Sequence, residues 1–135
     1  MAIKIYIDYG SQPSRAVLAF CYILNLTPEI TTFDILSAEH HKPPFLAINP
    51  ARRLPALTDP DTNPNLHIFE SAAILRYLAN KFLPPKNSWY PRDCPAKQLR
   101  VEQGLMDYYK KIRTIVMAGY ARYIAPMFGR KGIMI

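Results

Sequence analysis

The sequence predicts an α/β domain with a mixed four-stranded sheet, followed by the start of an all-α domain. Three observations support this prediction. Strand-like and helix-like hydrophobic patterns alternate over residues 1–83, prolines crowd residues 84–96, and one long helical pattern occupies residues 97–135. We therefore expect a first domain at 1–83, a proline-rich linker at 84–96 and an incomplete helical domain at 97–135.

The first half of the α/β domain has the pattern of a β-α-β unit. Residues Lys4–Asp8 alternate apolar and polar side chains, and residues 10–13 then supply turn and helix-start chemistry. Apolar residues three and four apart predict a helix over Ser14–Leu26, which Pro28 closes. Residues Glu29–Ile35 are rich in β-branched side chains, which predicts a second strand parallel to the first.

The second half has the pattern of a long connection, a hairpin and a helix. The connection over residues 36–53 is rich in proline and histidine, with one helical turn expected near Phe45–Ile48. Two short strands, Leu54–Thr58 and Leu66–Phe69, flank a run of turn-forming residues and predict an antiparallel hairpin. A helix is expected over Ser71–Phe82, with Ser71 as its cap.

The segment after the linker has the pattern of one long helix. Its apolar residues keep helical spacing from Leu99 to about Ala125, and Pro126 is expected to end it. Residues 84–135 carry ten Lys and Arg against three Asp and Glu, whereas residues 1–83 carry seven of each. The net charge of +7 therefore belongs to the second segment alone.

Composition indicates a folded protein of a reducing compartment. Half of the residues are apolar, and no apolar run reaches the roughly 18 residues of a membrane span. The two cysteines, Cys21 and Cys94, fit neither a disulfide framework nor a zinc spacing. We therefore expect a cytoplasmic protein with free thiols and without membrane association.

Several short stretches, spread from the first predicted strand to the linker, stand out as a set. They are Ser11-Gln-Pro-Ser-Arg-Ala16, Glu39-His40, Phe45-Leu-Ala-Ile-Asn49, Arg53-Leu-Pro-Ala-Leu57, Glu70-Ser-Ala-Ala-Ile-Leu-Arg-Tyr-Leu78 and Trp89-Tyr-Pro91. Together with the element order, they resemble the cytosolic glutathione transferases, and the theta class in particular, over residues 1 to about 113. The resemblance implies a thioredoxin-like first domain, glutathione as co-substrate with no further cofactor, a small hydrophobic electrophile and a homodimer.

Ser11 is the residue that we expect to activate the glutathione thiol. A hydroxyl that donates to sulfur beside the positive end of a helix dipole stabilises the thiolate, which is the form that attacks well. The simpler interpretation is that Ser11 only caps the helix. The resemblance adds Arg113, in the helix after the linker, as a residue that assists the serine.

Two further pairs of residues are expected to hold glutathione. Leu54-Pro55 resembles the cis-proline step with which the family pairs its backbone to the cysteinyl part, although most Leu-Pro bonds are trans. Glu70 and Ser71, at a predicted helix start, would hold the ammonium and the carboxylate of the γ-glutamyl group. An ordinary helix cap with an acidic residue in the first turn is the alternative.

Positive or donor side chains are expected to bind the glycyl carboxylate. His40 matches the theta-class connection, while His41 and Arg53 stand where that class often has lysine. Adjacent histidines could also suggest a metal. They point apart in an extended chain, however, and no third ligand stands out, so no metal is expected.

Other functions stay open at this point. The family builds its electrophile pocket largely from the helical domain, so the chain could be a non-catalytic binding or interaction module. A thiol-disulfide reductase fits the fold, but Cys21 lies about three turns into the first helix, on its apolar face. Tyrosines among basic residues over Tyr108–Tyr123 could bind nucleic acid, although Tyr109, Tyr120 and Tyr123 fall on the apolar stripe and fit packing better.

Overall fold

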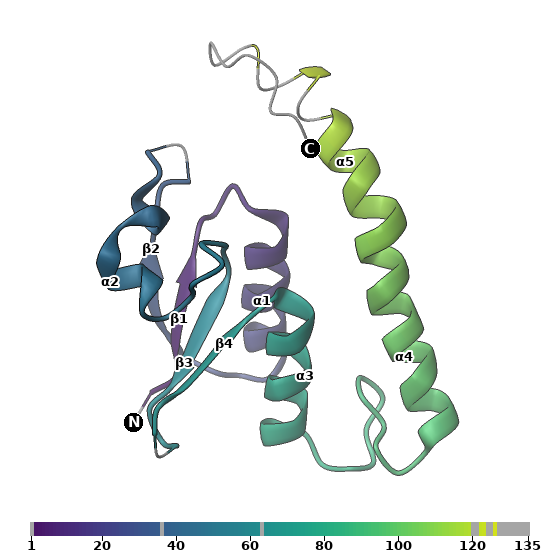
Figure 1. The fold of residues 1–135 in the computed structure, drawn as a ribbon. Helices are drawn as coiled ribbons and strands as arrows, with labels where there is room; N and C mark the ends of the chain where they lie inside the picture. The colour runs from purple at the N-terminus through teal and green to yellow at the C-terminus, as the bar shows by residue number, and fades with distance from the viewer. Residues whose placement is uncertain (1, 36, 63, 120–121, 124–125, 127–135) are drawn as a thin grey trace. The chain divides into compact units, whose positions relative to one another are not determined.

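A computed structural model describes residues 2–35, 37–62, 64–119, 122–123 and 126. The chain divides into two compact units, Met1–Asn87 and Ser88–Ile135. Figure 1 shows the strands and the shorter helices of the first unit and the long helix of the second. The first unit contains β1 (Lys4–Ile7), α1 (Gln12–Ile23), β2 (Glu29–Thr32), the 3-10 turn η1 (Glu39–His41), α2 (Pro43–Leu46), β3 (Ala56–Asp59), β4 (Leu66–Phe69) and α3 (Ser71–Phe82).

The first unit is built on the mixed four-stranded sheet that the sequence predicts. The strand order is β2-β1-β3-β4, with β1 and β2 parallel and the other two pairs antiparallel. In this register Tyr6 lies between Thr31 on β2 and Ala56 on β3, and Ala56 lies opposite Phe69 on β4. The β-α-β unit and the hairpin are therefore both confirmed.

The buried side chains form two clusters, one on each face of the sheet, because successive side chains along β1 point to opposite faces. Ile5 and Ile7 on β1 are fully buried and belong to a core cluster that includes residues of α1 and α3. Tyr6 points to the opposite face and packs on a second cluster around Phe45 of α2. Figure 1 shows α1 and α3 on one side of the sheet and α2 on the other. The second cluster consists of Phe45, Leu54 and Ala56, with Tyr6, Phe33 and Ile48 packed against it.

The first helix is displaced from its predicted range because its ends depend on local chemistry. It begins at Gln12 rather than Ser14 and ends at Ile23 rather than Leu26. Asn25 has a φ of 54°, its N–H donates to Tyr22 O at 3.0 Å, and the N–H of Leu26 donates to Cys21 O at 2.9 Å. This pair of bonds around a left-handed asparagine is a Schellman ending, so the helix stops before Pro28.

Smaller boundary differences occur in the connection and the strands. The helical turn expected at Phe45–Ile48 lies at Pro43–Leu46, because a proline is favoured in the first turn of a helix. The second strand ends at Thr32 rather than Ile35, and the third begins at Ala56 rather than Leu54. The cores of these elements are as predicted, and only their ends differ.

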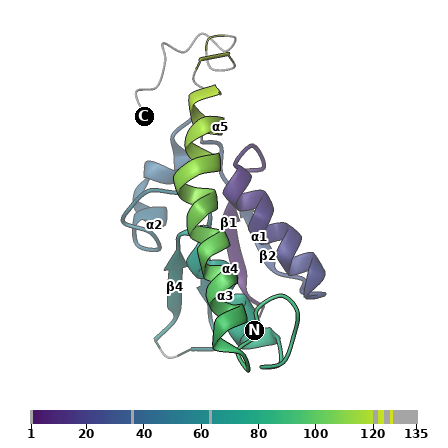
Figure 2. The ribbon, with the colours of Figure 1, turned by 90° about the vertical axis from the view of Figure 1, so that its right-hand side faces the viewer.

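The second unit contains one continuous helical stretch among the residues that the structure describes. It consists of α4 (Pro95–Asp107), the π-helical segment η2 (Tyr108–Ile112) and α5 (Arg113–Gly119), which follow one another without a break (Figure 2). The predicted end at Ala125 lies outside the described residues. In the described part of the chain, no helix is long and apolar enough to cross a membrane. The exposed apolar side chains of α4 and α5 include Leu99, Met106, Ile115, Val116 and Met117.

Candidate functional site

The predicted site residues of the first unit gather at one edge of the sheet. β1, β2 and β4 end at this edge, and β3 starts from it, as the pairing directions require. Because Ala56 lies opposite both Tyr6 and Phe69, the chain just after β1, just before β3 and just after β4 emerges side by side. The edge therefore carries Ser11, Leu54, Pro55, Glu70 and Ser71, with His40 and His41 in the connection that leaves β2.

Ser11 occupies the N-cap position of α1, but its hydroxyl does not act as a cap. The backbone is extended there, with φ −78° and ψ 120°, and the side chain makes no capping hydrogen bond. The N–H of Ser11 donates to Asp8 O at 3.0 Å, and its carbonyl accepts from the N–H of Arg15 at 3.1 Å. The Ser11 hydroxyl is therefore not engaged in capping in this structure, and its role towards a thiol stays a prediction.

The peptide bond between Leu54 and Pro55 is cis, as the resemblance implies. Both residues are buried, and the loop before them is organised by Asn49, which is fully buried. Asn49 Nδ2 donates to Arg53 O at 2.7 Å, and its Oδ1 accepts from the N–H of Ala51 at 2.9 Å. No role was predicted for Asn49 from the sequence. An asparagine ahead of a loop with two arginines and a proline is nevertheless a signal for a turn that its side chain holds.

Glu70 and Ser71 lie at the start of α3, although not in the expected positions. Glu70, not Ser71, is the N-cap residue, and Ser71 is the first helical residue and is buried. The predicted range Ser71–Phe82 is confirmed, and only the cap is wrong: Glu70, with φ 70° and ψ 115°, is the last residue before the helix. Arg53 Nη1 lies 3.9 Å from Glu70 Oε1, so the structure brings together two groups that were predicted for opposite ends of the ligand.

Positive backbone φ angles concentrate around this site. Of the non-glycine residues that the structure describes, Ala38, Arg52 and Glu70 have φ values of 56°, 57° and 70°, and Asn25 ends α1. Ala38 precedes η1, which carries both histidines, and Arg52 precedes Arg53. Such conformations are unfavourable for L-residues and persist where the surrounding structure enforces them, often at functional sites.

The two histidines lie against each other in η1. Their ring centroids are 4.3 Å apart at an interplanar angle of 73°, because a 3-10 turn and not an extended chain carries them. His40 is buried, and its Nδ1 has no hydrogen-bond partner. Burial lowers the pKa of His40, His41 lowers it further, and Asp8 opposes the shift. Among the described residues, no group of three or more His, Cys, Asp or Glu could hold a metal ion.

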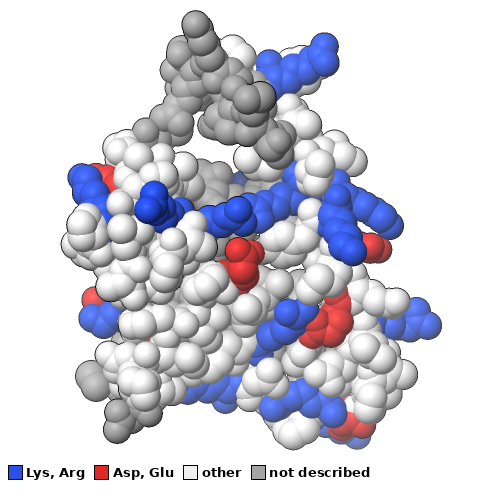
Figure 3. Space-filling view, in the orientation of Figure 1, with Lys and Arg blue, Asp and Glu red and all other residues white. Residues whose placement is uncertain are grey.

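The electrostatics of the edge favour a bound anion. The amino termini of α1 and α3, each a helix of 12 residues, both point to this edge, and neither first turn contains an acidic residue. Figure 3 shows Lys, Arg, Asp and Glu side chains on one face of each unit, so the charge at the edge itself depends on the individual residues that lie there. The two helix termini would therefore favour a bound carboxylate, while Glu70 places a negative group directly before α3.

Two other features of the first unit lie away from this edge. Cys21, inside α1, is only 3% exposed, and burial raises the pKa of its thiol to about 11, so it is poorly suited to thiol exchange. A cavity of about 230 Å³ is lined by Cys21 and by residues such as Ile3, Pro28 and Phe82. These residues precede β1 and β2 or end α3, so the cavity lies at the opposite edge of the sheet.

Arg113 belongs to the second unit and is described there by itself. It is the first residue of α5, directly after the π-helical segment, and its guanidinium carbon lies 5.3 Å from the centre of the Tyr109 ring. Single π-helical turns within α-helices frequently occur at functional sites. The role of Arg113 towards Ser11 stays a prediction.

Comparison with known proteins decides the family. The model of the glutathione S-transferase N-terminal domain matches residues 1–80. The chain belongs to the glutathione S-transferase family. It is 33% identical to human glutathione S-transferase theta-1 over 129 residues and 35% identical to human theta-2 over 130 residues. These alignments cover 95% and 96% of this chain, which spans about half (51%) of the length of each of these relatives.

Solved structures of glutathione transferases have the same fold. The crystal structure of human theta-2 in complex with glutathione and an unknown ligand has a TM-score of 0.78 at 34% identity, covering 95% of this chain and 51% of that one. The human theta-class enzyme in complex with the glutathione conjugate of 1-menaphthyl sulfate has a TM-score of 0.80 at 33% identity, covering 96% and 51%. The thioredoxin-like first domain and the theta-class resemblance are therefore confirmed.

Proposed function

We propose that this chain binds glutathione at the edge that carries Ser11 and Glu70, and that it lowers the pKa of the glutathione thiol. The observation that carries the proposal is the Ser11 hydroxyl, which lies at the positive end of α1 and is not used for capping. Glu70 and Ser71 at the start of α3 would bind the γ-glutamyl group, and His40, His41 and Arg53 the glycyl carboxylate. The glutathione complex of human theta-2 supports this choice of ligand.

The proposed reaction is conjugation of glutathione to a small hydrophobic electrophile. The thiol loses its proton to solvent, and the sulfur lone pair forms a bond to the electrophilic carbon while the leaving group departs with its electron pair. Ser11 donates a hydrogen bond to the thiolate and does not itself become covalently bound. A free thiol of this kind has a pKa of about 8.5, so stabilising the anion raises the reactive fraction at neutral pH.

A non-catalytic glutathione-binding module is the second candidate. It is favoured by the exposed apolar side chains of α4 and α5, which suit contact with a partner. Both candidates predict glutathione binding, and only the transferase predicts turnover. Titration calorimetry with glutathione, followed by assays with a panel of electrophiles, separates them, and a chain that does not bind glutathione would contradict both.

Ser11→Ala is expected to raise the pKa of the bound glutathione thiol by about one unit, since one hydrogen bond to a charged group is lost. The measurement is an ultraviolet titration of the thiolate in the complex. Affinity for S-methylglutathione, which has no ionisable thiol, should stay unchanged. Ser88→Ala, an exposed serine of the second unit, is the matched control. A thiol pKa that is the same in Ser11→Ala and the wild type would refute the role of this hydroxyl.

Glu70→Gln is expected to weaken glutathione binding about 10-fold to 100-fold, because the ligand ammonium loses a charged acceptor. The measurement is titration calorimetry at pH 7, and S-methylglutathione should lose affinity equally. Glu29→Gln removes a carboxylate from the other end of the sheet, where Glu29 pairs with Lys4 at 3.2 Å, and should leave both affinities unchanged. Equal affinities in Glu70→Gln and Glu29→Gln would remove Glu70 from the site.

A further inference from the structure

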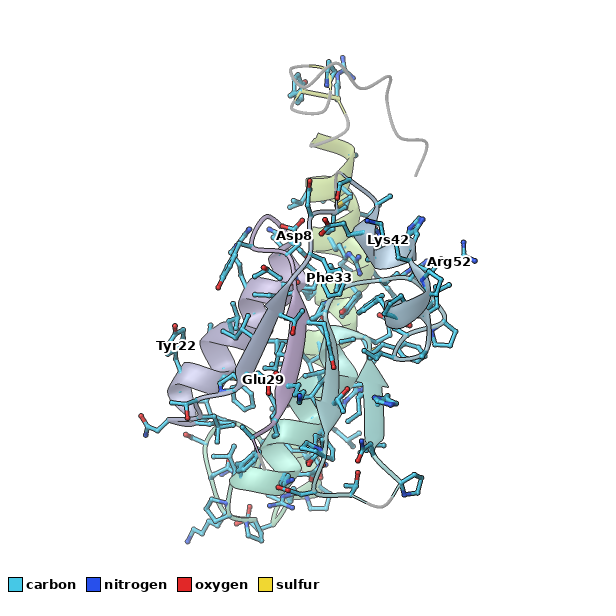
Figure 4. All side chains as sticks on the ribbon, turned by 90° about the vertical axis from the view of Figure 1, so that its left-hand side faces the viewer. Asp8, Tyr22, Glu29, Phe33, Lys42 and Arg52 are labelled. Atoms are coloured by element: carbon cyan, nitrogen blue, oxygen red, sulfur yellow. The ribbon has the colours of Figure 1, made fainter. Side chains whose placement is uncertain are left out.

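Asp8, the residue after β1, uses both oxygens of its side chain to hold two different loops. Oδ1 accepts a hydrogen bond from the N–H of Gly10 at 2.6 Å, and Oδ2 accepts one from the N–H of Ile35 at 2.9 Å. Its backbone carbonyl also accepts from the N–H of Ser11 at 3.0 Å. Figure 4 shows Asp8 beside Phe33 at one end of the strands, with Glu29 near the other end. One side chain thus joins the turn that carries Ser11 to the connection that carries the histidines.

The contact with Ile35 extends the pairing of β1 and β2 beyond the strands themselves. The last backbone bond between these two segments runs from the N–H of Phe33 to Ile7 O at 2.8 Å. Two residues further along, the Asp8 carboxylate replaces the β1 backbone as the acceptor for Ile35. The chain then leads into η1, where His40 lies close enough to Asp8 for their charges to interact. Asp8 therefore fixes the first residues of this connection to the end of β1.

The Ser11 turn is held from its other side by α1. Arg15 Nη1 donates to Tyr9 O at 2.8 Å and to Gly10 O at 3.0 Å. A Cβ added at Gly10 would lie 3.1 Å from Asp8 Oδ1, which leaves little room between the turn and the carboxylate. The carbonyls of the turn are thus bound by α1, and its N–H groups at Gly10 and Ser11 are bound by the carboxylate and the backbone carbonyl of Asp8.

We infer that Asp8 is a positioning residue for glutathione, an inference that rests on the proposed function. Its carboxylate keeps the Ser11 turn and the His40 connection at a fixed separation, so the groups for the thiol and for the glycyl carboxylate are preorganised before the ligand binds. Only an ionised carboxylate can accept at both oxygens, because an amide side chain offers a single acceptor atom. Asparagine at this position retains one of the two loop contacts, and alanine retains neither.

The test compares Asp8→Asn and Asp8→Ala with wild type in the full 135-residue chain. Asp8→Asn should weaken binding of glutathione about tenfold, since one hydrogen bond to a charged acceptor is lost, and Asp8→Ala should weaken it further. S-methylglutathione should lose affinity in the same order. The pKa of the bound glutathione thiol should rise, because Ser11 is no longer held in place. Asp93→Asn, the same change at an exposed residue of the second unit, should change none of these values.

A purely structural role for Asp8 predicts a different result. It would lower the unfolding midpoint while leaving the thiol pKa and the affinities of the folded variants at wild-type values, and that outcome overturns the inference. If Asp8→Ala does not fold, Gly10→Ala disturbs the Oδ1 contact without removing the carboxylate and should shift the same values in the same direction. Wild-type values in Gly10→Ala and Asp8→Asn together would also overturn it.

Amide hydrogen exchange distinguishes this inference from the proposed function. The exchange rates of the Gly10 and Ile35 amides, measured without ligand, should both increase in Asp8→Ala, because both lose their acceptor. If the wild-type chain does not bind glutathione, the proposed function fails. The two exchange rates still test whether Asp8 holds both loops, because they are measured without ligand. Faster exchange at both amides then supports the coupling of the two loops, and unchanged exchange overturns it.

Discussion

Asp59→Ala is expected to lower the free energy of unfolding of the first unit by about 3 kcal/mol or more. Asp59 ends β3 and is fully buried, and its Oδ2 accepts hydrogen bonds from the hydroxyl of Tyr77 and the ammonium of Lys81, both on α3. Its Oδ1 accepts from the N–H of Asp61 at 2.9 Å. Removing the carboxylate leaves a tyrosine hydroxyl and a partly exposed ammonium without this acceptor. Because the Lys81 side chain retains 30% exposure, we expect the lower end of the range for broken buried ion pairs.

Urea denaturation of the full chain, with amide exchange as a probe of the first unit, measures this effect. Asp61→Ala is the matched control, because Asp61 lies 4.0 Å from the same Lys81 Nζ but is 47% exposed, and it should lower stability by less than about 1 kcal/mol. A double-mutant cycle between Asp59→Ala and Lys81→Ala should show coupling. Similar losses in Asp59→Ala and Asp61→Ala would contradict the importance of the buried network.

The same network makes stability depend on pH in acid. Burial alone would raise the pKa of Asp59, but the hydrogen bonds from Lys81 and Tyr77 outweigh it and hold this pKa below its usual value. The stabilisation is therefore complete above the unfolded-state pKa of about 3.9 and is lost as pH falls through the lower folded-state value. The stability difference between wild type and Asp59→Ala should be constant near neutrality and shrink below about pH 4.

The parts of the fold and site that could be predicted depend on local sequence. The β-α-β and hairpin patterns follow from side-chain periodicity, whereas the choice of Ser11, Leu54-Pro55 and Glu70 rests on the resemblance of short stretches to the glutathione transferases. Each of these residues lies next to one end of β1, β3 or β4. Once the strand order is known, these strand ends can be placed side by side at one edge of the sheet, so the residues are expected to lie close together. The sequence was thus sufficient to locate the candidate site, although not to describe its geometry.

The remaining features depend on contacts between distant residues. The bond from Asp8 to Ile35 spans 27 positions and exists because β1 and β2 are parallel in one particular register. The positive φ of Glu70, which makes Glu70 rather than Ser71 the N-cap residue of α3, is likewise invisible in a pattern of residue types. Asn25 is different, because asparagine near a helix end is a known ending signal, and weighing it above Pro28 would have placed the end of α1 correctly.

Phe45→Ala is expected to lower the free energy of unfolding by about 3–5 kcal/mol, the usual range for a buried phenylalanine. Phe45 is only 1% exposed, and its ring centroid lies 4.9 Å from that of Phe33 and 6.0 Å from that of Tyr6. Leu54 belongs to the same cluster, so the Phe45 ring supports the residue that precedes Pro55. Denaturation in urea measures the loss. Phe82→Ala, at a ring that is 38% exposed, removes the same atoms and should have a clearly smaller effect.

The conservative variant Phe45→Leu separates the support of the site from overall stability. It should remain folded, because leucine retains much of the buried apolar volume and so leaves a smaller cavity than alanine does. The smaller side chain nevertheless loses the ring contacts to Phe33 and Tyr6. The positions of Leu54 and of the connection that carries Phe45 are then fixed by fewer contacts. Glutathione affinity, measured by calorimetry on the folded variant, should fall in Phe45→Leu and stay at the wild-type value in Phe82→Ala. Equal affinities in the two variants would show that this second core cluster stabilises the fold without organising the glutathione site.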